Sequence, residues 1–334
     1  MPKFLSIFPF LFSLIVAPEL AGAQEGNFNA GVTRIMVQTD NEPLTALVWY
    51  PTEEHGEPWS LGPFQIAAVR DSAVSTREAF PLVVISHGRQ SDPLAHRQLA
   101  ASLARNGFVV VAPTHKGDAF GMPPQPLSEV FRQRPEEARS VISSMLADER
   151  FAPSIDPERV GMIGYSAGGY TALVLAGASP NFAAAAAYCA GEGTADVGSC
   201  GSDGWLMSAD AQRALETWQP IADPRLKAVV LFDPHAMMFD GSGLARVQAP
   251  VLLYRPENDS LMPAQVNAEL VSSSLGDLAT AHTVPGRHFV FIDPCPPAIA
   301  AEAALICQDA PEVDRAALHR QIEAEVAAYL KQHL

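Results

Sequence analysis

The sequence predicts an α/β protein with a mostly parallel central sheet and helices on both faces of it. Short continuous apolar runs recur along the chain, such as LVVIS at 82–86 and FVVVA at 108–112. Runs of this kind are typical of strands buried on both faces. Helical patterns separate them, and strands that alternate with helices indicate βαβ units and a parallel sheet.

The remaining elements follow from the same patterns. A pair of strands is expected within 31–50, joined by a turn-like segment, so that the sheet starts antiparallel and is mixed. Further strands are expected at 160–165, 227–232, 250–254 and 282–284, and helices at 94–106, 135–146, 167–176, 264–273 and 311–333. Pro135 is placed in the first turn of its helix, where proline is tolerated.

Composition and charge narrow the function classes. The chain has 334 residues, of which 48% are hydrophobic and 18% charged, which suits one large domain, although two are possible on length alone. The formal net charge of −15 gives an acidic surface that repels nucleic acid and anionic lipid. We therefore expect neither as a partner.

The first residues have the pattern of a secretory signal. Lys3 precedes an apolar run at 4–17, and Ala21-Gly22-Ala23 has the small-x-small pattern of a cleavage site. We predict that residues 1–23 are removed and that 24–334 form the domain of a secreted or periplasmic protein. The alternative is a retained membrane anchor, which the shortness of the run disfavours. No later segment is expected to span a membrane.

Export gives the four cysteines a structural interpretation. An even number in an oxidising compartment indicates disulfides. Of the three possible pairings we favour the local one, Cys189–Cys200 with Cys295–Cys307. No pair has the CxxC spacing of a zinc site.

Residues 178–224 interrupt the alternation of strands and helices. The segment is longer than an ordinary connection between a helix and a strand. We expect a small cap insertion closed by a disulfide, in which Trp205, Met207 and Trp218 either wall an apolar pocket or pack the cap itself. The alternative is a surface insertion with no role at the site.

One motif carries chemistry. Gly164-Tyr165-Ser166-Ala167-Gly168 fits G-x-S-x-G and lies directly between an apolar strand and a helix rich in Ala and Leu. This is the setting of a nucleophile elbow, in which small flanking residues allow the sharp turn. The strand before the motif and the helix after it make Ser166 the predicted nucleophile.

A serine nucleophile needs a histidine base and an acid that follow it in the chain. His288 lies in a Pro/Gly-containing loop after the last expected strand, and we predict that it is the base. Asp259 and Asp233 each follow a strand at its carboxyl end, where a parallel sheet places its site. We favour Asp259 as the acid, with Asp233 as the alternative.

The oxyanion of acyl transfer needs backbone N–H donors. The N–H of Ala167 and that of Arg89, in the segment Ser86-His87-Gly88-Arg89 after a strand, are the expected oxyanion-hole donors. No metal-ligand or nucleotide-binding motif is found, so neither a metal nor a cofactor is expected.

These segments together resemble a known family. FPLVVISHG, NGFVVVAPTH, VGMIGYSAGG, APVLLYRPENDSLMP and GRHF are similar to the α/β-hydrolase superfamily, especially its dienelactone-hydrolase-like and platelet-activating-factor-acetylhydrolase-like esterases, and also to polyester hydrolases. The resemblance implies the α/β-hydrolase fold. In the polyester branch, the catalytic acid lies at the position that matches Asp259 in this chain. In the acetylhydrolase branch, it lies at the position that matches Asp233. Dienelactone hydrolases proper use a cysteine, where this chain has Ser166.

The resemblance also implies a substrate class. We expect a serine esterase that acts on a small-molecule ester through an acyl-enzyme, with His235 lining the substrate pocket. Two alternatives stay open, namely an amidase or peptidase with the same triad, and a binding protein that uses the fold without catalysis.

Overall fold

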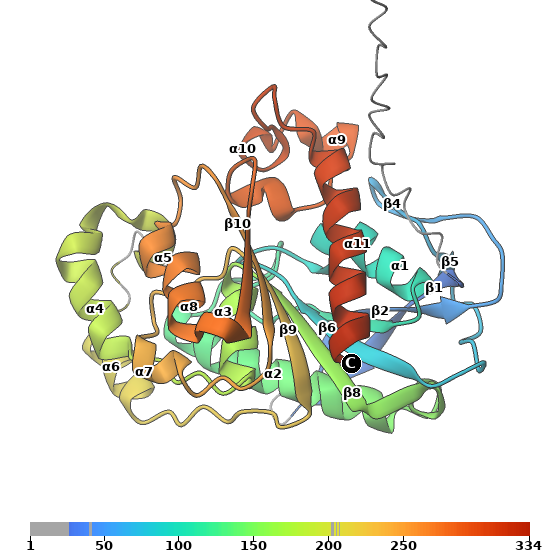
Figure 1. The fold of residues 1–334 in the computed structure, drawn as a ribbon, viewed down its shortest axis with the longest axis horizontal. Helices are drawn as coiled ribbons and strands as arrows, with labels where there is room; N and C mark the ends of the chain where they lie inside the picture. The colour runs from blue at the N-terminus through green and yellow to red at the C-terminus, as the bar shows by residue number, and fades with distance from the viewer. Residues whose placement is uncertain (1–26, 40–41, 202–203, 205, 207) are drawn as a thin grey trace, which may run out of the picture.

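The computed structural model describes residues 27–39, 42–201, 204, 206 and 208–334, and these form a nine-stranded sheet with helices on both faces (Figure 1). The signal predicted at 1–23 lies outside the described residues, as do Trp205 and Met207 of the expected cap. Within the described part of the chain, no helix combines the length and the apolarity that crossing a bilayer requires.

The sheet is mostly parallel, as predicted. Its strand order is β11-β10-β9-β8-β6-β7-β2-β1-β5; β6 to β11 run parallel, and β1 and β2 form the expected antiparallel start. The strands are β1 (Asn29–Val37), β2 (Leu44–Thr52), β5 (Val69–Arg70), β6 (Phe80–Ser86), β7 (Val109–Pro113), β8 (Ile155–Tyr165), β9 (Leu226–Phe232), β10 (Val251–Pro256) and β11 (Ala279–Val284). A separate hairpin joins β3 (Trp59–Leu61) to β4 (Phe64–Ile66).

Every residue of β6 and β7 is buried, which explains why these strands are continuous apolar runs. The helices are α1 (Arg97–Arg105), α2 (Leu127–Ala147), α3 (Ala167–Leu175), α4 (Phe182–Ala190), α5 (Val197–Cys200), α6 (Ala209–Glu216), α7 (Gly241–Leu244), α8 (Ala268–Leu275), α9 (Pro297–Ala300), α10 (Ala304–Cys307) and α11 (Arg315–His333). Short 3-10 helices include η1 (Pro93–His96) and η7 (His288–Phe291).

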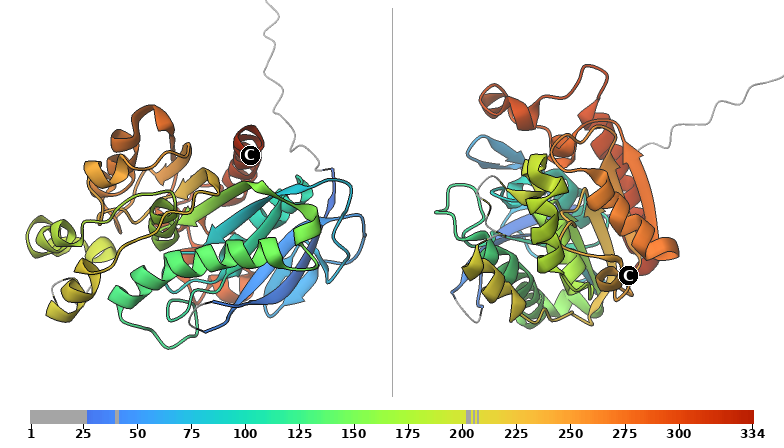
Figure 2. Two further views of the ribbon diagram at one scale, coloured as in Figure 1. Left: turned by 90° about the horizontal axis from the view of Figure 1, so that it is seen from below. Right: turned by 90° about the vertical axis from the view of Figure 1, so that its left-hand side faces the viewer.

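The two faces of the sheet carry separate cores. Helices α1 and α11 pack on one face, and α2, α3 and α8 pack on the other (Figure 2). Buried apolar residues of each helix meet alternate residues of the strands, for example Val83 on one face and Val84 on the other. This is the layered arrangement that the alternation of strands and helices predicted.

The start of one helix was predicted wrongly. Helix α2 begins at Leu127, so Pro135 lies inside it instead of in its first turn. The residues before the proline explain this: Val130 and Phe131 are fully buried and continue the apolar stripe of the helix upstream. Their burial outweighs the backbone hydrogen bond that a proline removes from a helix interior.

Both predicted disulfides are confirmed. Cys189 pairs with Cys200 and Cys295 with Cys307. The first lies within the segment 178–224, which holds α4, α5 and α6, and links the end of α4 to α5. The second closes a loop between η7 and α11, near the carboxyl edge of the sheet.

Candidate active site

Ser166 lies at a sharp turn directly after the carboxyl end of β8, a central strand of the sheet. Strand β8 pairs with β6 on one side and β9 on the other, ends at Tyr165, and is followed at once by α3. The backbone of Ser166 has φ 52° and ψ −116°, which is strained for a residue with a side chain. Hydrogen bonds hold this turn, since the N–H of Ser166 donates to the carbonyl of Phe232 at 3.0 Å.

The flanking glycines are sterically required. A Cβ on Gly164 would stand 2.2 Å from the carbonyl oxygen of Gly168, and one on Gly168 would stand 1.8 Å from the carbonyl oxygen of Ser86. The turn therefore packs directly against the end of β6. This explains physically why the motif needs small residues at both positions.

The segment predicted to hold the oxyanion lies next to the elbow. A Cβ on Gly88 would meet the ring of Tyr165 at 2.9 Å and the Cβ of Ser166 at 3.5 Å, so only glycine lets this loop approach so closely. In the described part of the chain, no hydrogen bond uses the backbone N–H of Arg89 or of Ala167. Both donors are free to meet a ligand oxygen beside Ser166.

His288 is held by two carboxylates. Its Nδ1 lies 2.6 Å from Oδ2 of Asp233 and 3.2 Å from Oδ2 of Asp259. Asp233 directly follows β9 and has φ 40°, while Asp259 follows β10, so the neighbouring strands bring both acids to one imidazole. The sequence presented these acids as alternatives, and the structure places both in contact with His288.

Burial and mutual contact set the protonation of this group. Burial raises the pKa of Asp233 to about 7, and the nearby Asp259 acts in the same direction. Burial alone would also raise the pKa of Asp259, but hydrogen bonds with His288 and Asp233 outweigh it and lower the pKa to about 2. The two carboxylates overcome the burial of His288 and raise its pKa to about 9.

Ser166 and His288 open into one cavity of about 630 Å³. Ser166 Oγ makes no hydrogen bond within the described residues. His235 also lines this cavity, and its Nε2 lies 2.9 Å from the carbonyl oxygen of Ser199. Burial lowers the pKa of His235 to about 3, so this imidazole is uncharged at neutral pH.

Comparisons with known proteins agree with this fold. The dienelactone hydrolase family model matches residues 72–197, and the prolyl oligopeptidase family model matches residues 141–273. A ferulic acid esterase from Streptomyces cinnamoneus is structurally similar, with a TM-score of 0.56 and 18% identity over 96% of this chain and 92% of that one. This chain has the α/β-hydrolase fold.

A second solved structure is similar to this chain. It is a cold-adapted esterase from an Arctic intertidal metagenomic library, with a TM-score of 0.49 and 16% identity, over 92% of this chain and 95% of that one. Comparison with curated protein sequences gives no significant match.

A buried ion pair holds the loop in which the sequence predicts an oxyanion donor. Nη1 of Arg134 lies 2.5 Å from Oδ2 of Asp118, and Nη2 donates to the carbonyl of His87. The other carboxylate oxygen of Asp118 accepts the N–H of Gln90 at 3.2 Å. The pair therefore binds the backbone on both sides of Gly88 and Arg89. Sequence patterns missed it, because Asp118 lies in a loop and Arg134 within α2.

A second serine–histidine–acid array lies behind the same segment. Ser86 Oγ is 2.8 Å from Nε2 of His115, whose Nδ1 is 2.7 Å from Oε2 of Glu137. Ser86 and His115 are fully buried and do not line the cavity around Ser166. A substrate carbonyl cannot reach Ser86, so we interpret this array as structural support for the end of β6.

Proposed function

We propose that this α/β-hydrolase is a secreted or periplasmic enzyme that cleaves carboxylic esters of small molecules through an acyl-enzyme on Ser166. One observation carries the proposal. Ser166 at the elbow shares a cavity with His288, and Nδ1 of that histidine contacts the carboxylates of Asp233 and Asp259. This is the arrangement that activates a serine hydroxyl.

The residues divide the reaction as follows. Ser166 Oγ attacks the ester carbonyl carbon while Nε2 of His288 takes its proton, and the carbonyl electrons move to oxygen. The N–H groups of Arg89 and Ala167 bind that oxyanion. The tetrahedral intermediate collapses, the C–O bond to the alcohol breaks, and His288 returns the proton to the leaving alkoxide. Water then attacks the acyl-enzyme, again with His288 as base, and releases the acid.

The acid of the triad is a carboxylate pair in this proposal. Asp233 makes the shorter contact with Nδ1 and is the principal partner that orients the imidazole and stabilises its positive charge. Asp259, the acid favoured by the sequence, is the second partner. Its other oxygen accepts the N–H groups of Leu261 and Met262, which fixes its direction.

Two further observations bear on the proposal. The disulfides support an oxidising compartment, since such bonds persist mainly outside the cytosol. The prolyl oligopeptidase match favours a second candidate, an amidase or peptidase with the same residues. Amide cleavage differs in that His288 must protonate a much more basic leaving group.

The test is hydrolysis of matched esters and amides by the purified protein. We expect turnover of 4-nitrophenyl acetate, little or no turnover of 4-nitroacetanilide, and the loss of ester turnover in Ser166→Ala with unchanged circular dichroism. Faster cleavage of the amide would favour the peptidase candidate. A Ser166→Ala variant as active as the wild type would refute the mechanism, and a folded wild type without turnover would favour a binding function.

A further inference from the structure

A disulfide-closed segment forms part of the active-site cavity. We name residues 294–308 the stapled wall; it holds α9 and α10 and is closed by Cys295–Cys307. It begins a few residues after His288 and therefore lies next to the catalytic base. Nothing in the sequence patterns pointed to this segment as part of the site.

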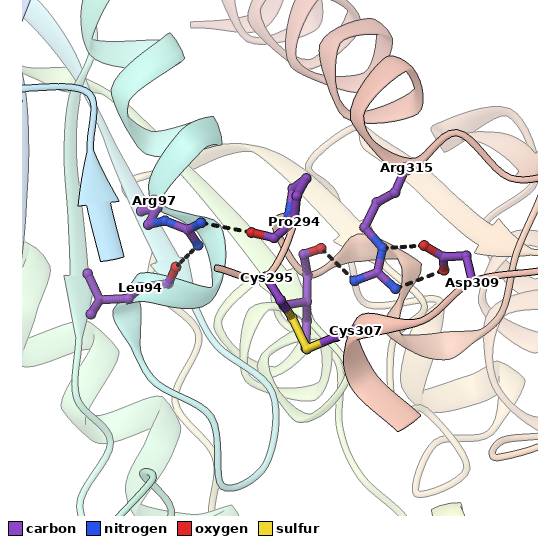
Figure 3. Close-up of a disulfide and its surroundings, with 8 residues drawn as sticks. Leu94, Arg97, Pro294, Cys295, Cys307, Asp309 and Arg315 are labelled. Atoms are coloured by element: carbon purple, nitrogen blue, oxygen red, sulfur yellow. Dashed lines mark hydrogen bonds and ion pairs between the residues drawn. A yellow bond between two sulfur atoms is a disulfide. The ribbon is translucent and has the colours of Figure 1, made fainter. Parts of the chain in front are cut away.

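Two buried arginines fix the ends of the stapled wall (Figure 3). Nη2 of Arg97 donates to the carbonyl of Pro294 at 2.9 Å, and Nη1 donates to that of Leu94 at 3.1 Å. Arg315 binds both oxygens of Asp309, at 2.7 and 2.8 Å, just beyond the other end. The segment is thus anchored at both ends and crosslinked within, as a rigid wall requires.

The wall turns an apolar side to the cavity. Its cavity-lining residues are Cys295, Pro296, Ile299, Ala303, Ile306 and Cys307. Phe64 and Phe289 line the cavity as well. From the insertion 178–224, by contrast, Val197 and Gly198 are the lining residues among those described. Among the described residues, the stapled wall therefore contributes more lining residues than the expected cap.

Among the described residues, the two carboxylates that line the cavity, those of Asp92 and Asp293, already have partners. Asp293 accepts the N–H of Gln98 at 2.6 Å and lies 3.6 Å from Arg97. Asp92 accepts the N–H of Leu94 at 2.7 Å. A cationic substrate group would have to compete with these contacts, whereas an apolar group would be buried against Ile299 and Ile306 without competition.

We propose that the stapled wall binds the bulky apolar part of the substrate, so that the enzyme prefers esters with a medium-length alkyl chain or a ring over acetate esters. This inference rests on the proposed esterase function and names its substrate class. The cavity volume of about 630 Å³ suits such a ligand. The disulfide is part of the specificity device, because it fixes the lining side of α9 relative to that of α10.

The test compares kcat/KM for 4-nitrophenyl octanoate and 4-nitrophenyl acetate in three variants. Ile306→Trp fills the cavity beside the wall. Leu305→Trp is its matched control, since Leu305 is the neighbouring residue of α10 but is 71% exposed and does not line the cavity. Cys295→Ser with Cys307→Ser removes the crosslink.

We expect the wild type to prefer the octanoate. Ile306→Trp should reduce the octanoate-to-acetate ratio roughly tenfold, the effect of one misplaced group in an apolar pocket. Leu305→Trp should leave the ratio within about twofold, and the double cysteine variant should lower it. If Ile306→Trp does not fold, Ile299→Trp in α9 takes its place with the same expectation.

The outcomes separate the two proposals. An unchanged ratio in a folded Ile306→Trp protein that still cleaves acetate overturns the role of the wall and leaves the esterase function standing. An equal fall in Leu305→Trp also overturns it, because the effect would then not come from the lining side. Absence of turnover of both esters by the folded wild type overturns the proposed function and this inference with it.

Discussion

The carboxylate of Asp233 lies 2.6 Å from Nδ1 of His288, closer than the 3.2 Å of Asp259. Asp233, which makes the shorter contact, is also the more deeply buried acid. Its side chain is 1% exposed, against 4% for that of Asp259. Charge-assisted hydrogen bonds are strongest when short and shielded from water. Asp233 is therefore the stronger partner of the imidazole, and Asp259 reinforces it.

Replacing each acid separately tests this order. We expect Asp233→Asn to lower kcat/KM for an activated ester by roughly 10²- to 10⁴-fold, as the loss of a triad acid does elsewhere. Asp259→Asn should cost about tenfold or less, because Asp233 still orients His288. Steady-state kinetics measure both. The reverse order would make Asp259 the principal acid.

Dialysis of the wild-type protein against EDTA should leave its rate unchanged. This experiment controls for a metal ion bound by Asp233, Asp259 and His288.

The pH dependence gives an independent check on the second carboxylate. Two nearby negative charges raise the pKa of His288 to about 9, and only its neutral form can take the proton of Ser166. Asp259→Asn removes one of those charges, so the pKa of His288 must fall and the base form must persist to lower pH. The acid limb of the kcat/KM profile should move down by roughly one pH unit. An acid limb that stays in place or moves to higher pH would contradict the claim that both carboxylates raise the pKa of His288.

Local patterns explain what could be predicted of this site. Ser166 could be predicted as a nucleophile because its strand, turn and helix are contiguous, and His288 as a base because it follows the last strand of the alternating pattern. The acid stayed open because Asp233 and Asp259 follow adjacent strands, and the sequence does not give the distance of either from the imidazole. The fold followed from the buried strands, whose apolar runs are continuous.

The interactions that could not be predicted all join distant segments. The Arg134–Asp118 pair and the Ser86–His115–Glu137 array are polar contacts inside the core, and no spacing rule connects their members. Pro135 misled the prediction of α2 because the local rule for proline was outweighed by tertiary burial. The stapled wall was missed because its role depends on where the chain returns after β11.

The buried arginine should be essential for stability. Arg134→Met leaves the carboxylate of Asp118 buried without its partner, which typically costs about 3 kcal/mol or more in the free energy of unfolding. Urea denaturation measures the change. The control is Arg213→Met in α6, whose ion pair with Asp210 is exposed and should contribute under about 1 kcal/mol. Equal effects of the two substitutions would show that the buried pair has no special role.

The close packing of the elbow predicts that Gly168 cannot be replaced by a larger residue without loss of activity. Gly168→Ala would place a Cβ 1.8 Å from the carbonyl oxygen of Ser86, so β6 or the elbow has to move. A displacement of about 1 Å at the nucleophile should reduce kcat by roughly 100-fold. In Gly241→Ala, the matched control in α7, the nearest atom is 3.8 Å away and activity should not change. Full activity in Gly168→Ala would mean that the elbow is less tightly packed than described.

The most direct test of the central claim is the site of covalent labelling by a fluorophosphonate. Among the described residues, Ser86 contacts His115, and Ser166 shares a cavity with His288; of these two serines only Ser166 lines the cavity. Mass spectrometry of peptides from the labelled protein should find one adduct, on Ser166, which is lost in Ser166→Ala and kept in Ser86→Ala. An adduct on any other residue, or labelling that persists in folded Ser166→Ala, would contradict the account.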